Sequence, residues 1–199
     1  GSYQRFNSED MNKFAITHKD LPNKDIFKPT NNEKIFISID MRKANFSSLH
    51  SYNKGIFGNA DTWEQFISRF TDNEHIINSK YIRQVILGNC NPKRHITYEK
   101  YLMDQILSML YDIVAEERLV FFSNDEIVYD MTTASNLHTL NLVKECIKER
   151  LNSKSKIPFR VELFSLYKIS GTDGYYKKIY QNDREYNIEF KCLDNYMMP

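Results

Sequence analysis

The spacing of apolar positions along the chain predicts short strands separated by helices. The nearly continuous apolar run KIFISID predicts a buried strand that ends at Asp40. The segments RLVFFS and EIVYDM predict two strands around a tight turn at Asn124 and Asp125. FRVELFSLYKI, residues 159–169, alternates like a half-buried strand. In the tail, YYKKIYQ and YNIEFK predict a further hairpin around the turn NDRE.

Four segments carry apolar residues at helical spacing. The first follows Asp61, a suitable cap, and the second covers about 74–87, before Gly88 and Asn89 end it. The third is capped by Thr97, and the fourth covers about 135–151. The core-facing residues expected are Trp63, Phe66, Ile67 and Phe70 in the first helix, Ile77, Tyr81, Val85 and Ile86 in the second, Tyr101, Leu102, Gln105, Ile106, Met109, Leu110, Ile113 and Val114 in the third, and Leu137, Leu140, Val143, Ile147 and Leu151 in the fourth.

The order of these elements predicts an α+β fold. Strand, helices, strand–turn–strand, helix and strand form the βαββαβ pattern of a ferredoxin-like antiparallel sheet with helices on one face. This domain would cover residues 34–169, with residues 170–199 as a C-terminal β-hairpin appendage. Residues 1–33 are polar and lack periodicity, which predicts an irregular N-terminal arm whose Gly1 and Ser2 are typical of an expression scar. Many functions share such a fold, so the fold alone does not indicate one.

Composition narrows the choice of partners and compartment. The 199 residues are 41% hydrophobic, enough for a sizeable core, and the net charge of +1 means that contacts with nucleic acid must come from local clusters of Lys and Arg. The three cysteines, Cys90, Cys146 and Cys192, lack CxxC spacing and fit a reducing, intracellular compartment, cytoplasmic or nuclear. Neither a transmembrane run nor a signal peptide is apparent, so we expect no membrane partner.

Three acidic residues stand where predicted strands end. Asp40 closes the first strand, and Asp125 and Glu126 occupy the turn of the central hairpin. In the predicted sheet these elements are neighbours, so the three carboxylates would converge. Clustered carboxylates repel one another unless a cation neutralises them, and Mg²⁺ or Mn²⁺ prefers such oxygen ligands. Two such ions support phosphoryl transfer, so the pattern predicts metal-assisted nucleotidyl transfer.

The same segments resemble palm-domain polymerases. FISIDMRKANFSSLHSY is similar to their first metal-binding motif, and FFSNDEIVYD is similar to their second acidic motif. The helix and strands of LMDQILSMLYDIVAEERLVFFSNDEIVYD resemble the tRNA-histidine guanylyltransferase group, although Met41 replaces its glycine and Asn124 is inserted. YIRQVILGNCNPKR resembles the basic helix of reverse transcriptases and family B DNA polymerases. The resemblance implies a palm fold that uses a nucleoside triphosphate and RNA or DNA.

Basic residues near the acids are candidates for binding phosphate. Arg42 and Lys43 follow Asp40, where an incoming triphosphate would lie if the acids hold a metal ion, and Arg83, Lys93 and Arg94 flank the GNCNP segment. The resemblance also places Phe46 under the sugar of the nucleotide.

Each of these residues also has a purely structural interpretation. Asp40 could cap a turn, Asp125 and Glu126 could be solvated turn residues, the basic residues could form a solvated face, and Phe46 could belong to the core.

The sequence therefore supports two classes of function. The first is Mg²⁺- or Mn²⁺-dependent nucleotidyl transfer to a nucleic-acid end, with Asp40, Asp125 and Glu126 as catalytic metal ligands. The second is a non-catalytic, palm-derived module that binds nucleic acid, a protein partner or a second copy of the chain. A cyclase-like enzyme that needs nucleotide but no template is a third reading of the same fold.

Overall fold

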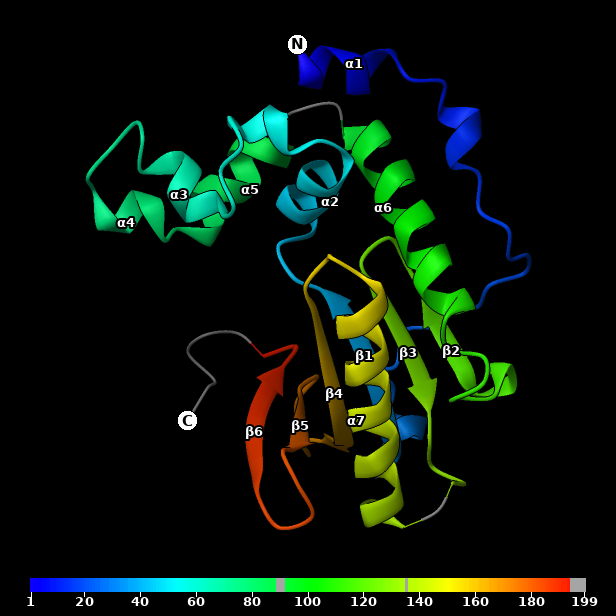
Figure 1. Ribbon diagram of the computed structural model, residues 1–199. Coiled ribbons are helices and arrows are strands. Elements are labelled where there is room, and N and C mark those ends of the chain that lie inside the picture. The colour runs from blue at the N-terminus through cyan, green and yellow to red at the C-terminus, as the bar shows by residue number, and fades with distance from the viewer. Residues whose placement is uncertain (89–91, 135, 194–199) are drawn as a thin grey trace.

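The computed structural model describes residues 1–88, 92–134 and 136–193. Within them the chain is α+β, with one antiparallel sheet of six strands in the order β2-β3-β1-β4-β5-β6 (Figure 1). The strands are β1 (Ile35–Met41), β2 (Leu119–Phe122), β3 (Glu126–Asp130), β4 (Phe159–Lys168), β5 (Tyr175–Tyr180) and β6 (Tyr186–Lys191). All six strand predictions are confirmed. The C-terminal hairpin continues the sheet, because β5 pairs with β4 along its whole length.

The α-helices in the described residues number seven. They are α1 (Ser2–Ser8), α2 (Ala44–Tyr52), α3 (Trp63–Ile67), α4 (Glu74–Ile77), α5 (Lys80–Gly88), α6 (Pro92–Ser108) and α7 (Leu137–Lys154). Short 3-10 turns are η1 (Met11–Phe14), η2 (Pro29–Asn31), η3 (Lys54–Phe57) and η4 (Glu116–Arg118). Helix α7 confirms the fourth predicted helix and begins at Asn136, whose side chain accepts a hydrogen bond from the Thr139 amide at 3.0 Å. Helix α2 was not predicted from the sequence.

The helix predicted over 74–87 was wrong as a single element. Asn78 ends α4, and the Ser79 hydroxyl then accepts from the Ile82 amide at 3.1 Å, which starts α5 in a new direction. As a result Tyr81 is 75% exposed and Val85 is 41% exposed instead of facing the core. Helices α3, α4 and α5 extend away from the sheet (Figure 1).

Two other helix boundaries also differ from the sequence prediction. Helix α3 starts after Thr62 and ends at Ile67, so Phe70 lies outside it and is 71% exposed. Helix α6 already includes Pro92, and the Thr97 hydroxyl donates to the Lys93 carbonyl at 2.9 Å inside the helix instead of capping it. In both cases the sequence offered more than one possible first residue. The structure uses Thr62 rather than Asp61 as the cap of α3, and its α6 includes Pro92, a residue suited to a first helical turn.

The N-terminal residues form part of the fold and not the irregular arm that the sequence predicted. Helix α1 buries Phe6 completely beside α6, and Phe14 of η1 is also buried. Further along, the Phe122 amide donates to the Pro22 carbonyl at 2.9 Å at the β2 edge. Ile26 then packs on the sheet face opposite to α6 and α7. The segment therefore packs against α6 at its start and against the opposite face of the sheet at Ile26.

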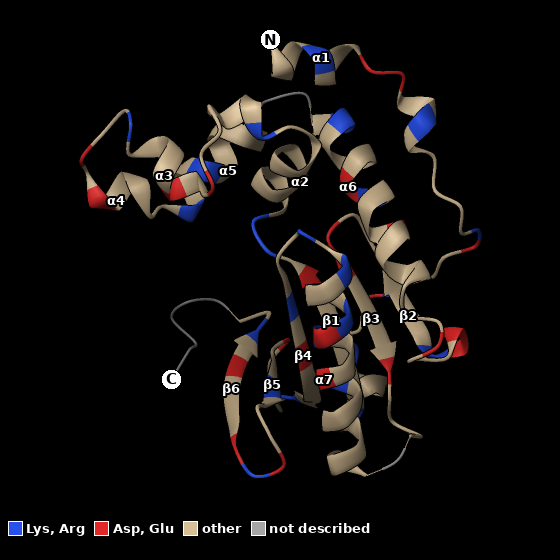
Figure 2. Cartoon of the chain, viewed as in Figure 1, with Lys and Arg blue, Asp and Glu red and all other residues tan. Residues whose placement is uncertain are grey.

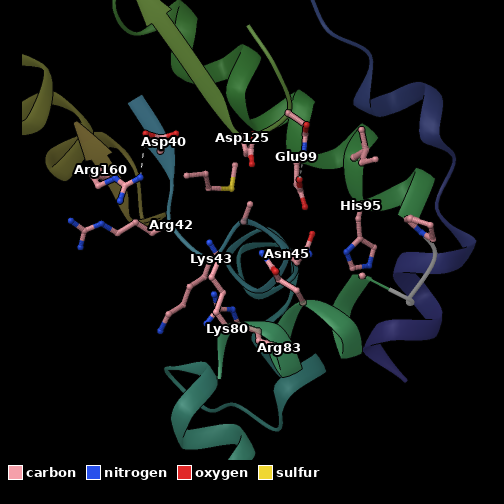
Figure 3. A pocket seen from close by; sticks show the side chains of 17 residues that line it. Asp40, Arg42, Lys43, Asn45, Lys80, Arg83, His95, Glu99, Asp125 and Arg160 are labelled. Atoms are coloured by element: carbon pink, nitrogen blue, oxygen red, sulfur yellow. Dashed lines mark hydrogen bonds and ion pairs between the residues drawn. The ribbon is translucent and has the colours of Figure 1, made fainter. Parts of the chain in front are cut away.

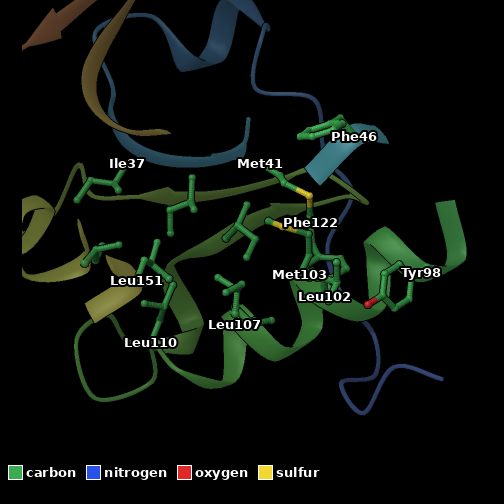
Figure 4. Packing of buried hydrophobic residues seen from close by; sticks show 14 of the residues in the cluster. Ile37, Met41, Phe46, Tyr98, Leu102, Met103, Leu107, Leu110, Phe122 and Leu151 are labelled. Carbon is green, nitrogen blue, oxygen red and sulfur yellow. The ribbon is translucent and has the colours of Figure 1, made fainter. Parts of the chain in front are cut away.

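Helices α6 and α7 cover one face of the sheet and enclose the main core. In β1, Ile37, Ile39 and Met41 belong to this core, together with residues of both helices such as Leu107 and Leu151 (Figure 4). The intervening residues of β1 alternate to the other face, and this places Asp40 there. The fold thus fixes the side of the sheet on which the last carboxylate of β1 lies.

Candidate functional site

The structure brings the three predicted acidic residues to one end of the sheet. Asp40 lies directly opposite Glu126 in the antiparallel pairing of β1 with β3. One residue further on, the Met41 amide donates to the Asp125 carbonyl at 2.8 Å. Ser123 orders the turn, since its hydroxyl donates to the Asp125 carboxylate and accepts from the Glu126 amide, both at 3.1 Å. Strand register therefore pairs Asp40 with Glu126, and the turn places the backbone of Asp125 next to that of Met41.

Glu126 is a half-buried acid that faces a second carboxylate. Burial, followed by the charge of Asp40 and a hydrogen bond with its carboxylate, raises the pKa of Glu126 to about 8. The Asp125 charge acts in the same direction, while Lys177 of β5 opposes it. The raised pKa favours a proton shared between the carboxyl groups of Glu126 and Asp40 at neutral pH. A cation at this position would take the place of that proton.

The cavity next to these acids has walls of opposite charge. It has a volume of about 830 Å³, within the range of small-molecule sites. Asp40 and Asp125 line one side, and Lys43, Lys80 and Arg83 line the other (Figure 3). Lys and Arg positions cluster at the β1–α2 connection and on α5 (Figure 2). Such a pocket suits a ligand that is itself strongly anionic and that carries or recruits a cation.

Basic residues reach the cavity from three elements. Arg42 and Lys43 follow β1, and the left-handed backbone of Lys43 (φ 49°) turns the chain directly into α2. Lys80 and Arg83 come from α5, and Arg160 comes from β4. The Arg160 guanidinium lies 3.8 Å from the Asp40 carboxylate and 3.2 Å from that of Glu162. Lys43 pairs with Glu64, and the two side chains are both partly exposed.

Helix α6 contributes two buried polar residues, His95 and Glu99, that the sequence analysis did not select. Glu99 is 1% exposed, and its Oε2 accepts from the Asn124 side chain at 2.6 Å, whereas its Oε1 has no hydrogen-bond partner among the described residues. Burial raises the pKa of Glu99 to about 7, although the Asn124 hydrogen bond lowers it, and the Asp125 charge adds to the rise. His95 is 2% exposed, neither ring nitrogen has a partner in the described chain, and burial lowers its pKa.

A sequence signal for this pair did exist. His95 and Glu99 precede Leu102 and Ile106 at intervals of three and four residues, so they extend the apolar stripe of α6 toward its N-terminus. Charged or polar residues on a buried stripe are uncommon and call for a partner. The signal was hidden because Thr97 was taken as the start of the helix, which left both residues at its margin or outside it.

Not every predicted site residue lines the cavity. Glu126, half-buried opposite Asp40, does not line it. Phe46 is 6% exposed and packs against Phe57, with ring centres 4.6 Å apart, in the core. Arg94 turns away and donates to the Glu9 carbonyl at 2.8 Å, so it fixes the N-terminal segment. Lys93 is exposed and does not line the cavity. Cys90 lies outside the described residues.

Comparison with known proteins identifies no related family. No protein-family model matches the chain, and no curated protein sequence is significantly similar to it. Across residues 1–88, 92–134 and 136–193, no three acidic, histidine or cysteine side chains are grouped so that they could hold a metal ion. In the same part of the chain, none of the helices combines the length and apolarity needed to span a membrane.

Proposed function

We propose that the chain is a metal-dependent nucleotidyltransferase that transfers a nucleotide to the end of an RNA or DNA. The observation that carries the proposal is the pairing of Asp40 with Glu126, with Asp125 adjacent, at the edge of a cavity lined by Lys and Arg. A nucleoside triphosphate matches both halves of this site: its phosphates are anionic, and it binds divalent cations.

The order of strands supports a palm-like architecture for this enzyme. Strands β2-β3-β1-β4, with α6 before the β2–β3 hairpin and α7 before β4, follow the ferredoxin-like βαββαβ pattern. In that pattern the end of the first strand and the central hairpin turn are adjacent. Palm-domain polymerases place their catalytic carboxylates at these two positions, and the chain has Asp40 and Asp125 there.

Carboxylates at the end of β1 and at the β2–β3 turn would supply part of a divalent-cation site, and substrate phosphates and waters would supply the rest. Asp40, Asp125 and Glu126 would hold Mg²⁺ or Mn²⁺, which would offset phosphate charge and favour attack by a hydroxyl. Mg²⁺ keeps several waters and substrate phosphates as ligands, so a site of few carboxylates is sufficient. Arg42, Lys80 and Arg83 would neutralise the triphosphate, and the rigid turn at Ser123 would keep Asp125 oriented. The acceptor would be a 3′-hydroxyl or a terminal phosphate.

Calorimetry with Mn²⁺ and a nucleoside triphosphate tests this proposal. The wild-type chain should bind nucleotide only with the metal, and Asp125→Asn should weaken binding by roughly tenfold or more because a charged ligand is lost. Asp130→Asn, at the opposite end of β3, is the matched control and should leave binding unchanged.

The non-catalytic module remains the alternative in the same experiment. It predicts that RNA or DNA binds equally well with and without Mn²⁺, and that Asp125→Asn changes neither binding event. That result would exclude the nucleotidyltransferase.

A further inference from the structure

Two buried polar side chains at the cavity lack partners in the described protein. Neither ring nitrogen of His95 makes a hydrogen bond, and Oε1 of Glu99 makes none. Both residues line the cavity, and both are more than nine-tenths buried. A buried polar group without a partner costs roughly 1–3 kcal/mol, and a charged group costs more. Since most such groups in proteins are satisfied, a polar ligand at this position is the simplest explanation.

The two residues lie away from the cations that suit phosphate. Lys80 and Arg83 belong to α5 and His95 and Glu99 to α6, and the pairs occupy separate parts of the cavity wall (Figure 3). Asn124, from the β2–β3 turn, occupies one oxygen of Glu99 and so fixes the orientation of the carboxyl group. Only Oε1 is then left without a hydrogen-bond partner among the described residues. The cavity is therefore polarised between a cationic part and a part that offers directed, short-range hydrogen bonds.

We propose that His95 and Glu99 bind the nucleoside part of the substrate, with Glu99 Oε1 accepting a hydrogen bond from a base N–H or a ribose O–H. This inference rests on the nucleotidyltransferase function proposed above and specifies how its substrate is selected. Buried groups that pair with a substrate N–H or O–H discriminate strongly against analogues without it, because the protein group is then left unsatisfied. Glu99 would thus let the protein itself discriminate among nucleotides, by the base if the donor is a base N–H and by the sugar if it is a ribose O–H.

Binding of inorganic tripolyphosphate and of nucleotides, each with Mn²⁺, tests the inference. The nucleotides are the four ribonucleoside triphosphates, their 2′-deoxy forms and inosine triphosphate. Wild-type protein should bind at least one nucleotide more tightly than tripolyphosphate. Glu99→Gln presents an amide N–H₂ in place of Oε1, since Asn124 continues to donate to the remaining oxygen. It should weaken binding of the preferred nucleotide by roughly tenfold to a hundredfold and leave tripolyphosphate unchanged.

Controls identify which group of the nucleotide donates the hydrogen bond and distinguish a specific effect from loss of folding. Loss of preference with the 2′-deoxy form assigns the donor to the ribose, and loss with a changed base assigns it to the base. Glu149→Gln, an exposed glutamate of α7, should change nothing. His95→Phe provides a second variant that should also affect only nucleotides, and circular dichroism verifies folding of each.

Two results would overturn the inference. The first is that Glu99→Gln weakens the binding of tripolyphosphate and of nucleotide equally. The second is that the wild-type protein binds both ligands with equal affinity. Either result would still be compatible with the proposed phosphate site. If the wild-type protein binds neither ligand, the nucleotidyltransferase proposal fails, and the inference fails with it.

Discussion

Replacing Glu126 with Gln should stabilise the metal-free protein at alkaline pH. The wild-type carboxyl lies beside Asp40, and burial raises its pKa to about 8 against 4.5 for a free glutamate. Ionising it inside the fold is therefore unfavourable. Protonated Glu126 contributes stability that is complete below pH 4.5 and is lost as pH rises through about 8. Gln at this position donates the same hydrogen bond to Asp40 and does not titrate.

The difference in pKa sets the size of the effect. A gap between 4.5 and about 8 corresponds to at most about 5 kcal/mol of unfolding free energy. The side chain is partly exposed, so solvent reduces this, and we expect Glu126→Gln to be about 2–3 kcal/mol more stable than wild type at pH 9. Near pH 4.5 the two proteins should have the same stability, since Glu126 is neutral there.

Urea unfolding between pH 4.5 and pH 9, in the presence of a chelator, measures this difference. Glu185→Gln, in the exposed β5–β6 turn, is the control and should follow the wild-type curve. Adding Mg²⁺ at about a hundred times its Kd should restore about 2.7 kcal/mol to wild type and less to Glu126→Gln, which lacks a charged ligand. A wild-type stability that does not fall relative to Glu126→Gln as pH rises would refute the assignment of a shared proton to Asp40 and Glu126.

Two further variants test other parts of the structure. The buried Asp104 carboxylate accepts hydrogen bonds from the backbone and side chain of both Thr17 and His18, at 2.5–3.1 Å. Asp104→Asn should therefore lower the free energy of unfolding in urea by about 2–4 kcal/mol. It should also speed proteolysis within residues 9–20. Lys177→Met removes a cation that lowers the pKa of Glu126, so the loss of stability should move to higher pH in the metal-free unfolding profile.

Matched controls exist for both variants. Asp72→Asn alters an exposed acid and should change neither the free energy of unfolding nor the rate of proteolysis. If Asp72→Asn and Asp104→Asn had equal effects, Asp104 would not be the residue that holds the N-terminal segment. Lys178→Met changes the next residue of β5, which points to the other face of the sheet, and should leave the midpoint of the pH profile in place. An unchanged midpoint in Lys177→Met would exclude its contact with the acidic cluster.

The strands could be predicted from the sequence because their signal is local. KIFISID and FRVELFSLYKI carry the apolar pattern of buried strands, and the hairpin turns are marked by Asn and Asp. The convergence of the acids followed from the expected topology. Helix boundaries were harder to predict, because several residues near each end can serve as a cap and tertiary packing chooses among them. Ser79, which divides α4 from α5, is one such choice.

The basic wall of the cavity could be predicted only in part. Arg42 and Lys43 adjoin Asp40 in sequence, and strand β1 therefore fixes them near the acids. Lys80, Arg83 and Arg94 all lie in basic stretches, yet only the first two line the cavity, because α5 turns at Ser79 and α6 directs Arg94 toward α1. Proximity in sequence to a charged segment does not specify which side of a helix faces a site.

The buried pair on α6 shows why a polar residue at a core position is informative only after its surroundings are known. In Asp104 the same helix buries a carboxylate with four hydrogen-bond donors around it, and this residue ties the N-terminal segment to the fold. Glu99, five residues earlier, has one donor from Asn124 and one free oxygen, and it lines a cavity. From the sequence the two acids are equivalent, since both lie on the buried side of one helix. The number of protein partners separates them: a satisfied acid stabilises structure, whereas an acid at a cavity with one unpaired oxygen is a candidate contact for a ligand.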